Sequence, residues 1–191
     1  MNKRVILVHG WGGGPHGGWF SWIRAQCVNN GITVIAPQLP HPDTPTREDW
    51  VEELAKSVGS LDEQTYFIGH SLGCQTILHY LSQHKENSRA GGAIFVAGFF
   101  DTLTGISEEE MILWKKWQSA TLDTEKIQAH LKQSVAIFSD NDPHVPLREE
   151  RSFREKLNAR TLILHNKGHF SGGDGQFDFP LLWNELQKMM R

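Results

Sequence analysis

The sequence predicts an α/β fold, a three-layer α/β/α sandwich with a mostly parallel sheet of about six strands. Two observations carry this prediction. Short apolar segments alternate with segments whose apolar residues recur at helical spacing, the pattern of β-α-β units. The apolar segments are hydrophobic throughout rather than at every second position, which indicates strands covered on both faces, as in a parallel sheet.

Six segments are expected to be the strands of this sheet. The first, RVILVHG, is a short β-branched run that ends in glycine. The others are equally short and apolar, so each is long enough for a strand and too short for a typical helix. In chain order the six segments cover residues 4–10, 32–37, 65–69, 91–98, 134–140 and 161–166.

Seven segments between and after these strands are expected to be helices. Thr46 and Asp49 come close to a capping box, and Ser107 and Glu110 have capping-box spacing, so both pairs mark helix starts. The first helix is expected to stop at an Asn-Gly pair, a C-terminal signal. The seven segments cover residues 19–31, 46–61, 72–84, 107–120, 123–133, 148–157 and 180–190.

Length and composition predict a single domain over residues 1–191, with 39% hydrophobic and 21% charged residues. The formal net charge of −3 argues against nucleic-acid and acidic-membrane partners and permits a monomer or a homodimer. No apolar run approaches the roughly 18 residues of a membrane helix. Cys27 and Cys74, without a CxxC motif or an export signal, are expected to be buried thiols in a reducing cytoplasm.

The segment FIGHSLGCQ (67–75) places Gly69 and Gly73 on either side of Ser71, between a strand and a helix. This is the spacing of a nucleophile elbow, G-x-S-x-G, in which a tight turn exposes the serine hydroxyl above the sheet. The turn also opens a helix, so the Leu72 N–H would face an oxyanion forming beside Ser71. The alternative is an ordinary glycine-rich turn in which Ser71 is an N-cap.

The loop HGWGGGPHGGW (9–19) is the candidate for the other half of an oxyanion hole. The Trp11 N–H would lie opposite that of Leu72, and the glycines allow this backbone to approach a reacting carbonyl closely. A phosphate-binding loop is the poorer interpretation. The loop holds no lysine, and residues 31–37 hold no Asp or Glu where a dinucleotide site needs one.

A serine nucleophile needs a base, and in this fold class the acid and then the histidine follow the serine along the chain. His169, after the sixth strand, is the candidate base, and Asp142, after the fifth, is the candidate acid that orients its imidazole. Asp140 is the alternative acid, although it could instead cap the turn. His165, expected within the strand, and His144 are expected to be structural. No metal is expected, because no histidine pair has His-x-x-x-His spacing within an expected helix.

Four residues are candidate substrate contacts. Trp19, in an aromatic cluster, is a candidate wall for an acyl group, with core packing as the alternative. Phe99 could line the leaving-group side, Gly12 belongs to the glycine-rich loop, and His70 could serve packing or orientation within the elbow. Residues 99–133 could form a short flap or helical insert over the site, or only complete the helix layer.

Four motifs, VHGWGGG, GHSLG, DNDPHVP and KGHF, together resemble the α/β-hydrolase superfamily. The short length and the segment WFSWIRAQC resemble the small serine hydrolases of the retinoblastoma-binding protein 9 and YdeN-like family. The resemblance spans essentially the whole chain. It implies the strand order 2-1-3-4-5-6, a triad of Ser71, Asp142 and His169, an oxyanion hole of the Leu72 and Trp11 N–H groups, and no cofactor.

The expected function is cleavage of small carboxylic esters, or of amides, through an acyl-enzyme, by a carboxylesterase-like serine hydrolase. Two alternatives stay open: an acyltransferase or lyase on the same scaffold, and a non-catalytic protein-interaction module. The complete set of three groups argues against the module. The expected partner is a small-molecule ester or amide, not a nucleic acid or a membrane.

Overall fold

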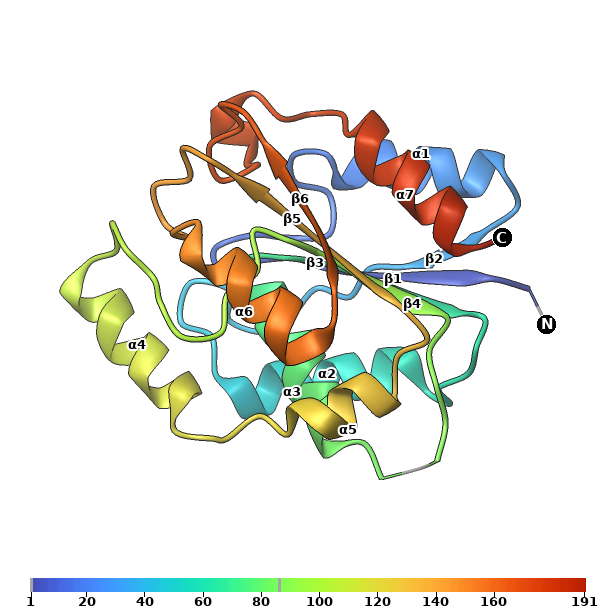
Figure 1. Cartoon of the computed structure of the whole chain (residues 1–191), viewed down its shortest axis with the longest axis horizontal. Helices are drawn as coiled ribbons and strands as arrows, with labels where there is room; N and C mark the ends of the chain where they lie inside the picture. The colour runs from blue at the N-terminus through green and yellow to red at the C-terminus, as the bar shows by residue number, and fades with distance from the viewer. Residues whose placement is uncertain (1, 86) are drawn as a thin grey trace.

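A computed structural model of the chain describes residues 2–85 and 87–191, which form a six-stranded sheet in the order β2-β1-β3-β4-β5-β6 (Figure 1). Every neighbouring pair of strands is parallel. The predicted α/β fold and strand order are therefore confirmed. The strands are β1 (Arg4–Val8), β2 (Thr33–Ile35), β3 (Thr65–His70), β4 (Gly92–Val96), β5 (Ser134–Ser139) and β6 (Arg160–Leu164).

Helices cover both faces of this sheet. α1 and α7 lie on one face, and α2, α3, α5 and α6 lie on the other (Figure 1). Every helix expected from the sequence is present, and a short 3-10 helix, η1, was not expected. The helices are α1 (Phe20–Asn29), α2 (Arg47–Val58), α3 (Leu72–Gln83), α4 (Glu108–Gln118), α5 (Thr124–Ala129), α6 (Arg148–Leu157), η1 (Gly172–Asp174) and α7 (Pro180–Met189).

The starts of two helices follow the capping signals in the sequence. At α4, Ser107 Oγ accepts from Glu110 N (3.2 Å) and the Glu110 carboxylate accepts from Ser107 N (2.6 Å), which completes a capping box. At α2, Thr46 Oγ1 accepts from Asp49 N at 3.3 Å. Each bond satisfies a backbone N–H that the first turn of a helix leaves without an intrahelical acceptor.

The centre of the sheet is buried, but its edges are not. All residues of β4 and β5 are buried, whereas the edge strands β2 and β6 are partly exposed, Ile163 to 52%. The expectation that every strand is covered on both faces is therefore wrong for the two edges. An apolar run reports hydrophobicity and does not report the position of its strand in the sheet.

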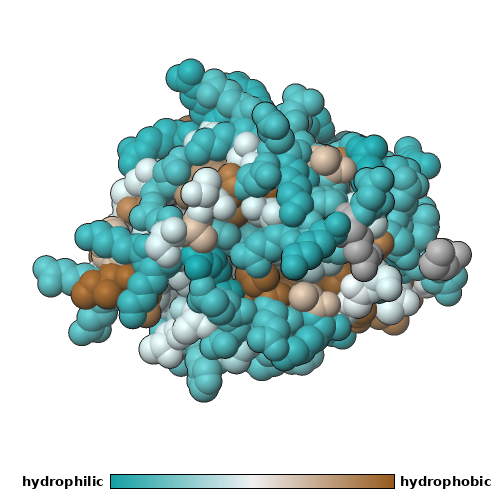
Figure 2. Space-filling model, turned by 90° about the horizontal axis from the view of Figure 1, so that it is seen from below, coloured by the Kyte–Doolittle hydropathy of each residue, from teal (hydrophilic) through white to brown (hydrophobic). Residues whose placement is uncertain are grey.

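The segment between β4 and β5 contains α4 and α5, which differ in their packing. α5 contacts α3 and α6, whereas α4 stands apart from the sheet, on the side where the strands end (Figure 1). Figure 2 shows the molecule from below, the side of α2, α3 and α5. This surface is mostly hydrophilic, with a hydrophobic patch at the edge where α4 lies. None of the described helices is long and apolar enough to pass through a bilayer.

The strand register brings several loops to one edge. Val8, at the end of β1, pairs with Gly69 on β3, and Gly69 pairs with Phe95 on β4. At the other side of the sheet, Ser139 on β5 pairs with Leu164 on β6. The loops that follow these strands therefore emerge together at the carboxyl edge, which is where open parallel sheets carry their chemistry.

Candidate active site

Ser71 lies on a strained turn between β3 and α3. Its backbone has φ 52° and ψ −122°, a combination that residues with a side chain rarely adopt. Ser71 N donates to Val96 O (2.9 Å), which holds the turn against β4. The Ser71 side chain makes no capping hydrogen bond to α3. Ser71 therefore occupies the N-cap position of α3, but its hydroxyl does not cap the helix.

The glycines on either side of Ser71 are needed because backbone and side chains approach them closely. A Cβ on Gly69 would lie 2.7 Å from Ile77 Cδ1. A Cβ on Gly73 would overlap the carbonyl oxygens of Val8 and His9, where the chain leaves β1. α3 therefore packs directly against the end of β1, which brings the loop after β1 next to Ser71.

The peptide bond between Gly10 and Trp11 has a fixed orientation in that loop. Gly10 O accepts from His9 Nδ1 (2.9 Å) and from Gly13 N (3.1 Å). The peptide bond is trans, so its N–H points opposite to its C=O, and the Trp11 N–H faces away from these donors. Among the described residues, no acceptor is bonded to Trp11 N or to Leu72 N. Two backbone donors are therefore free beside Ser71.

The His9 ring has a defined protonation state, which allows it to hold this peptide bond in place. Leu39 N donates to His9 Nε2 (3.1 Å), so Nε2 is an acceptor and the ring proton lies on Nδ1. Burial lowers the pKa of His9, which is 2% exposed. A neutral ring with its proton on Nδ1 is the form that can donate to Gly10 O.

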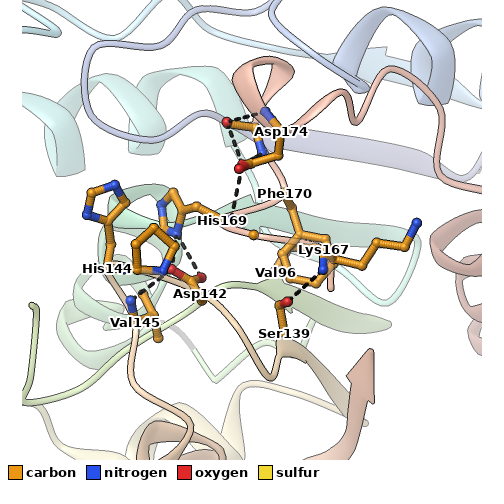
Figure 3. A network of polar contacts seen from close by, with 12 residues as sticks. Val96, Ser139, Asp142, His144, Val145, Lys167, His169, Phe170 and Asp174 are labelled. Atoms are coloured by element: carbon orange, nitrogen blue, oxygen red, sulfur yellow. Dashed lines mark hydrogen bonds and ion pairs between the residues drawn. The ribbon is translucent and has the colours of Figure 1, made fainter. Parts of the chain in front are cut away.

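His169 and Asp142 form a pair at the carboxyl ends of β6 and β5 (Figure 3). His169 Nδ1 lies 2.9 Å from Asp142 Oδ2 and 3.1 Å from Oδ1. The side chain of Asp142 is 1% exposed and that of His169 15%. Asp142 Oδ1 also accepts from His144 N (2.8 Å) and Val145 N (3.0 Å), so the carboxylate is held independently of the histidine.

Asp140, the alternative acid, is engaged outside this pair. Its Oδ1 accepts from Asn166 N (2.9 Å), and its Oδ2 lies 2.6 Å from His165 Nδ1. The bonds from Asn166 and His165 lower the pKa of Asp140. His165 was expected within the strand but lies just beyond β6, with its side chain 80% exposed. Asp140 therefore caps the turn after β6.

Ser71 and His169 line one cavity, but in the described part of the chain no hydrogen bond joins their side chains. Bonds between a nucleophile and its base are often loose before a substrate binds. The structure thus pairs Asp142 with His169 and has Ser71 at the same cavity, without a hydrogen bond between the Ser71 and His169 side chains.

Three side chains that the sequence analysis did not single out hold the loop that carries His169. The backbone N–H groups of residues 167, 168 and 169 donate, in that order, to Ser139 Oγ (2.9 Å), Asn141 Oδ1 (2.8 Å) and Asp174 Oδ2 (3.1 Å) (Figure 3). Asp174 also forms a capping box with Ser171 at the start of η1. The S-x-x-D spacing of residues 171–174 is a sequence signal that could have identified Asp174.

A cavity of about 390 Å³ opens beside Ser71. Of the predicted substrate contacts, Gly12, His70 and Phe99 line it, and Trp19 does not. Trp19 is 1% exposed and lines an adjoining groove of about 230 Å³. Lining residues that were not predicted as substrate contacts include Asp43, Leu103, Ile106, Glu110, His144 and Ser171.

One wall of this cavity is tied to α6 by a buried carboxylate. Glu149 is 2% exposed, and it accepts from Phe100 N (2.7 Å) through Oε2 and from Thr102 N (2.8 Å) through Oε1. Leu103 and Ile106, which follow in the same segment, line the cavity. The position of this wall therefore depends on a contact with a helix about 50 residues later in the chain.

In the described part of the chain, neither a metal-binding group nor an activated thiol accompanies this site. Within residues 2–85 and 87–191, no three His, Cys, Asp or Glu side chains form a group that could hold a metal ion. Cys27 and Cys74 are free and buried, as expected. Burial raises the pKa of Cys27 to about 12 and raises that of Cys74 as well, so neither thiol is an activated nucleophile.

The chain is similar to known hydrolases in sequence and in structure. The family model described as serine hydrolase matches residues 5–188. YdeN of Bacillus subtilis (strain 168) is 27% identical over 186 residues, which cover 97% of this chain and 95% of YdeN. The serine hydrolase RBBP9 of Rattus norvegicus is 26% identical over 171 residues, 87% of each chain. The crystal structure of the B. subtilis ydeN gene product has a TM-score of 0.91 at 26% identity, over 99% of both chains. The resemblance to this group is confirmed, and because the family match covers nearly the whole sequence, the chain belongs to the serine hydrolase family.

Proposed function

We propose that this serine hydrolase cleaves small carboxylic esters, and amides of similar size, through an acyl-enzyme on Ser71. His169 is the general base, Asp142 orients it, and the N–H groups of Trp11 and Leu72 stabilise the oxyanion. The observation that carries the proposal is the His169–Asp142 pair at 2.9 Å beside a serine held at φ 52°.

The proposed reaction uses Ser71 and His169, which line the cavity. Ser71 Oγ attacks the carbonyl carbon while its proton passes to His169 Nε2, and His169 then protonates the leaving alcohol or amine. A water molecule, deprotonated by His169, attacks the acyl carbon, releases the carboxylic acid and restores the Ser71 hydroxyl. Removing one oxyanion-hole donor typically costs about 10²–10³ in kcat, so the free N–H groups would contribute a large part of the rate enhancement.

The lining of the cavity supports uncharged substrates of modest size. Leu103, Ile106 and Phe99 offer apolar surface to an acyl chain or an alcohol. Asp43 and Glu110 are carboxylates at the same cavity, and in the described part of the chain no Lys or Arg lines it. An anionic group on the substrate would therefore meet like charge and find no cationic partner.

Two measurements test the proposal. A fluorophosphonate probe should label the wild-type protein and should not label Ser71→Ala. A series of 4-nitrophenyl esters of increasing acyl length should then show turnover that falls once the acyl chain outgrows the 390 Å³ cavity. Labelling of Ser71 without hydrolysis of any ester would favour the acyltransferase or lyase, and no labelling at all would favour the interaction module.

We expect the protein to act in the cytoplasm, as a monomer or a homodimer, and without a cofactor. The support for a reducing compartment is that Cys27 and Cys74 are both free and buried. The support for cofactor-free chemistry is that the proposed acyl transfer needs only the serine, the imidazole, the carboxylate and water.

A further inference from the structure

His70 precedes Ser71 in the elbow, and its side chain reaches the loop that carries His169. His70 Nε2 lies 2.7 Å from the backbone oxygen of His169. A carbonyl oxygen only accepts, so His70 Nε2 carries the ring proton and donates it. We infer that His70 is a positioning residue whose imidazole anchors the backbone of His169 to the nucleophile elbow. The inference rests on the proposed function, because it assumes that His169 is the base.

His169 is held at three of its four polar groups. Its carbonyl oxygen accepts from His70 (2.7 Å), its N–H donates to Asp174 (3.1 Å), and its Nδ1 lies 2.9 Å from Asp142. In the described part of the chain, Nε2 is the polar atom of His169 with no such partner. Nε2 is also the atom that must accept the proton of Ser71.

The His70 anchor differs from the other two in where it comes from. Asp142 lies in the loop after β5 and Asp174 in η1, which follows β6, and both bond directly to His169. His70 ends β3 and is covalently bonded to Ser71. Its hydrogen bond joins residues 99 positions apart and so ties the base directly to the frame of the nucleophile. A misplacement of about 1 Å in such a pair can cost about a hundredfold in rate.

The His70 ring is itself constrained and uncharged. The Trp19 ring meets it edge-on at 6.0 Å, and the His169 ring lies 5.0 Å away. Burial and the neighbouring His169 lower the pKa of His70 well below its usual value. His70 therefore donates its hydrogen bond without placing a second positive charge beside the imidazolium that forms on His169. Lysine or arginine would supply a donor but would add that charge.

Two other roles for His70 make different predictions. His70 lines the catalytic cavity, but its Nε2–H is already committed to His169 and is not available to a substrate. If His70 only filled space, any side chain of similar size would replace it. A positioning role requires a donor at the Nε2 position, which glutamine can supply and leucine cannot.

The test compares His70→Gln and His70→Leu with wild type in the full-length protein. We expect His70→Leu to lower kcat about a hundredfold with KM changed less than about threefold, and His70→Gln to recover most of that loss. His79→Leu is the control, because His79 is another histidine of lowered pKa but lies buried on α3, outside the catalytic cavity. It should keep wild-type kcat. Circular dichroism spectra and midpoints of thermal unfolding show whether each variant is folded.

Two kinetic outcomes would overturn the inference, and so would one NMR result on the wild type, which needs no variant to fold. If His70→Leu kept wild-type kcat, or if His70→Gln were as impaired as His70→Leu, the hydrogen-bond donor at position 70 would have no role in catalysis. In ¹⁵N-histidine NMR of the wild type, residue 70 should be neutral with its proton on Nε2; a proton on Nδ1 with a bare Nε2 would show that the bond is absent. Failure of the fluorophosphonate to label wild-type Ser71 would overturn the proposed function and this role together. Labelled wild type with an unaffected His70→Leu overturns this role alone.

Discussion

Replacing Asp142 with asparagine exchanges one carboxylate oxygen for an NH2 group, and the structure determines which one. Oδ1 accepts from the N–H groups of His144 and Val145, so the asparagine keeps its oxygen there. The NH2 group then takes the place of Oδ2, 2.9 Å from His169 Nδ1. A donor at that place requires a bare Nδ1, so the proton of neutral His169 moves to Nε2 and the ring cannot accept the proton of Ser71.

The expected cost is about 10⁴-fold in kcat, the loss seen when a triad histidine is held in the wrong tautomer. This corresponds to about 5 kcal/mol of activation free energy. KM should change little, because the Asp142 side chain is 1% exposed and Asp142 does not line the cavity. The fold should persist, since asparagine keeps both bonds to backbone N–H groups.

Asp140→Asn is the matched control, two positions away along the chain. Asp140 also pairs with a histidine and a backbone N–H, but those partners, His165 and Asn166, do not line the cavity. We expect this variant to keep kcat within about threefold of wild type in a 4-nitrophenyl ester assay. A larger loss in Asp140→Asn than in Asp142→Asn would refute the assignment of the acid. Activity of Asp142→Asn within about tenfold of wild type, with its His169 protonated on Nε2 by ¹⁵N NMR, would refute the tautomer argument.

Three further predictions concern stability and selectivity. Burial lowers the pKa of His79 to about 4 from 6.5, so the stability that its neutral form supports is present above pH 6.5 and is lost as the pH falls toward 4. His79→Leu should therefore remove up to about 3 kcal/mol of the acid-induced loss in urea unfolding, and an unchanged pH dependence would contradict this. Glu149→Gln should lower the free energy of unfolding by about 2 kcal/mol and raise KM more than it lowers kcat, because the bonds to the wall at Phe100 and Thr102 weaken; an unchanged KM would count against it. Asp43→Asn should raise kcat/KM for a 4-nitrophenyl ester with a terminal carboxylate about fivefold relative to its uncharged analogue, and a constant ratio would exclude a role for this charge.

The fold and the candidate acid–base pair were predictable because they depend on local patterns. Each strand ends near a short polar loop, and parallel strands bring those loops to one edge, so placing Asp142 beside His169 needed only the order of the elements. The choice of Asp142 over Asp140 agrees with the observed hydrogen bonds. The exposure of the edge strands β2 and β6 was not predicted, because an apolar run in the sequence does not show whether a strand lies at the centre or at the edge of the sheet.

The lining of the cavity was less predictable because it comes from contacts across the fold. Trp19 was a candidate substrate contact with core packing as the alternative, and its indole donates to the backbone of Phe170 and packs in the core. Glu149 and Asp174 hold loops through bonds to backbone N–H groups, which leave little trace in a single sequence. The capping pattern at Ser171 is a signal that could have identified Asp174, but it was not used.

The segment that forms one wall of the cavity is separate from the strands and loops that carry Ser71, Asp142 and His169. Leu103 and Ile106 precede α4 in a stretch that inserts between β4 and β5, and none of the proposed reacting groups belongs to it. Substitutions there would alter which molecules enter without disturbing bond cleavage. The substrate range of this scaffold can therefore be varied, by natural selection or in an engineered library, through substitutions in the segment that contains Leu103 and Ile106.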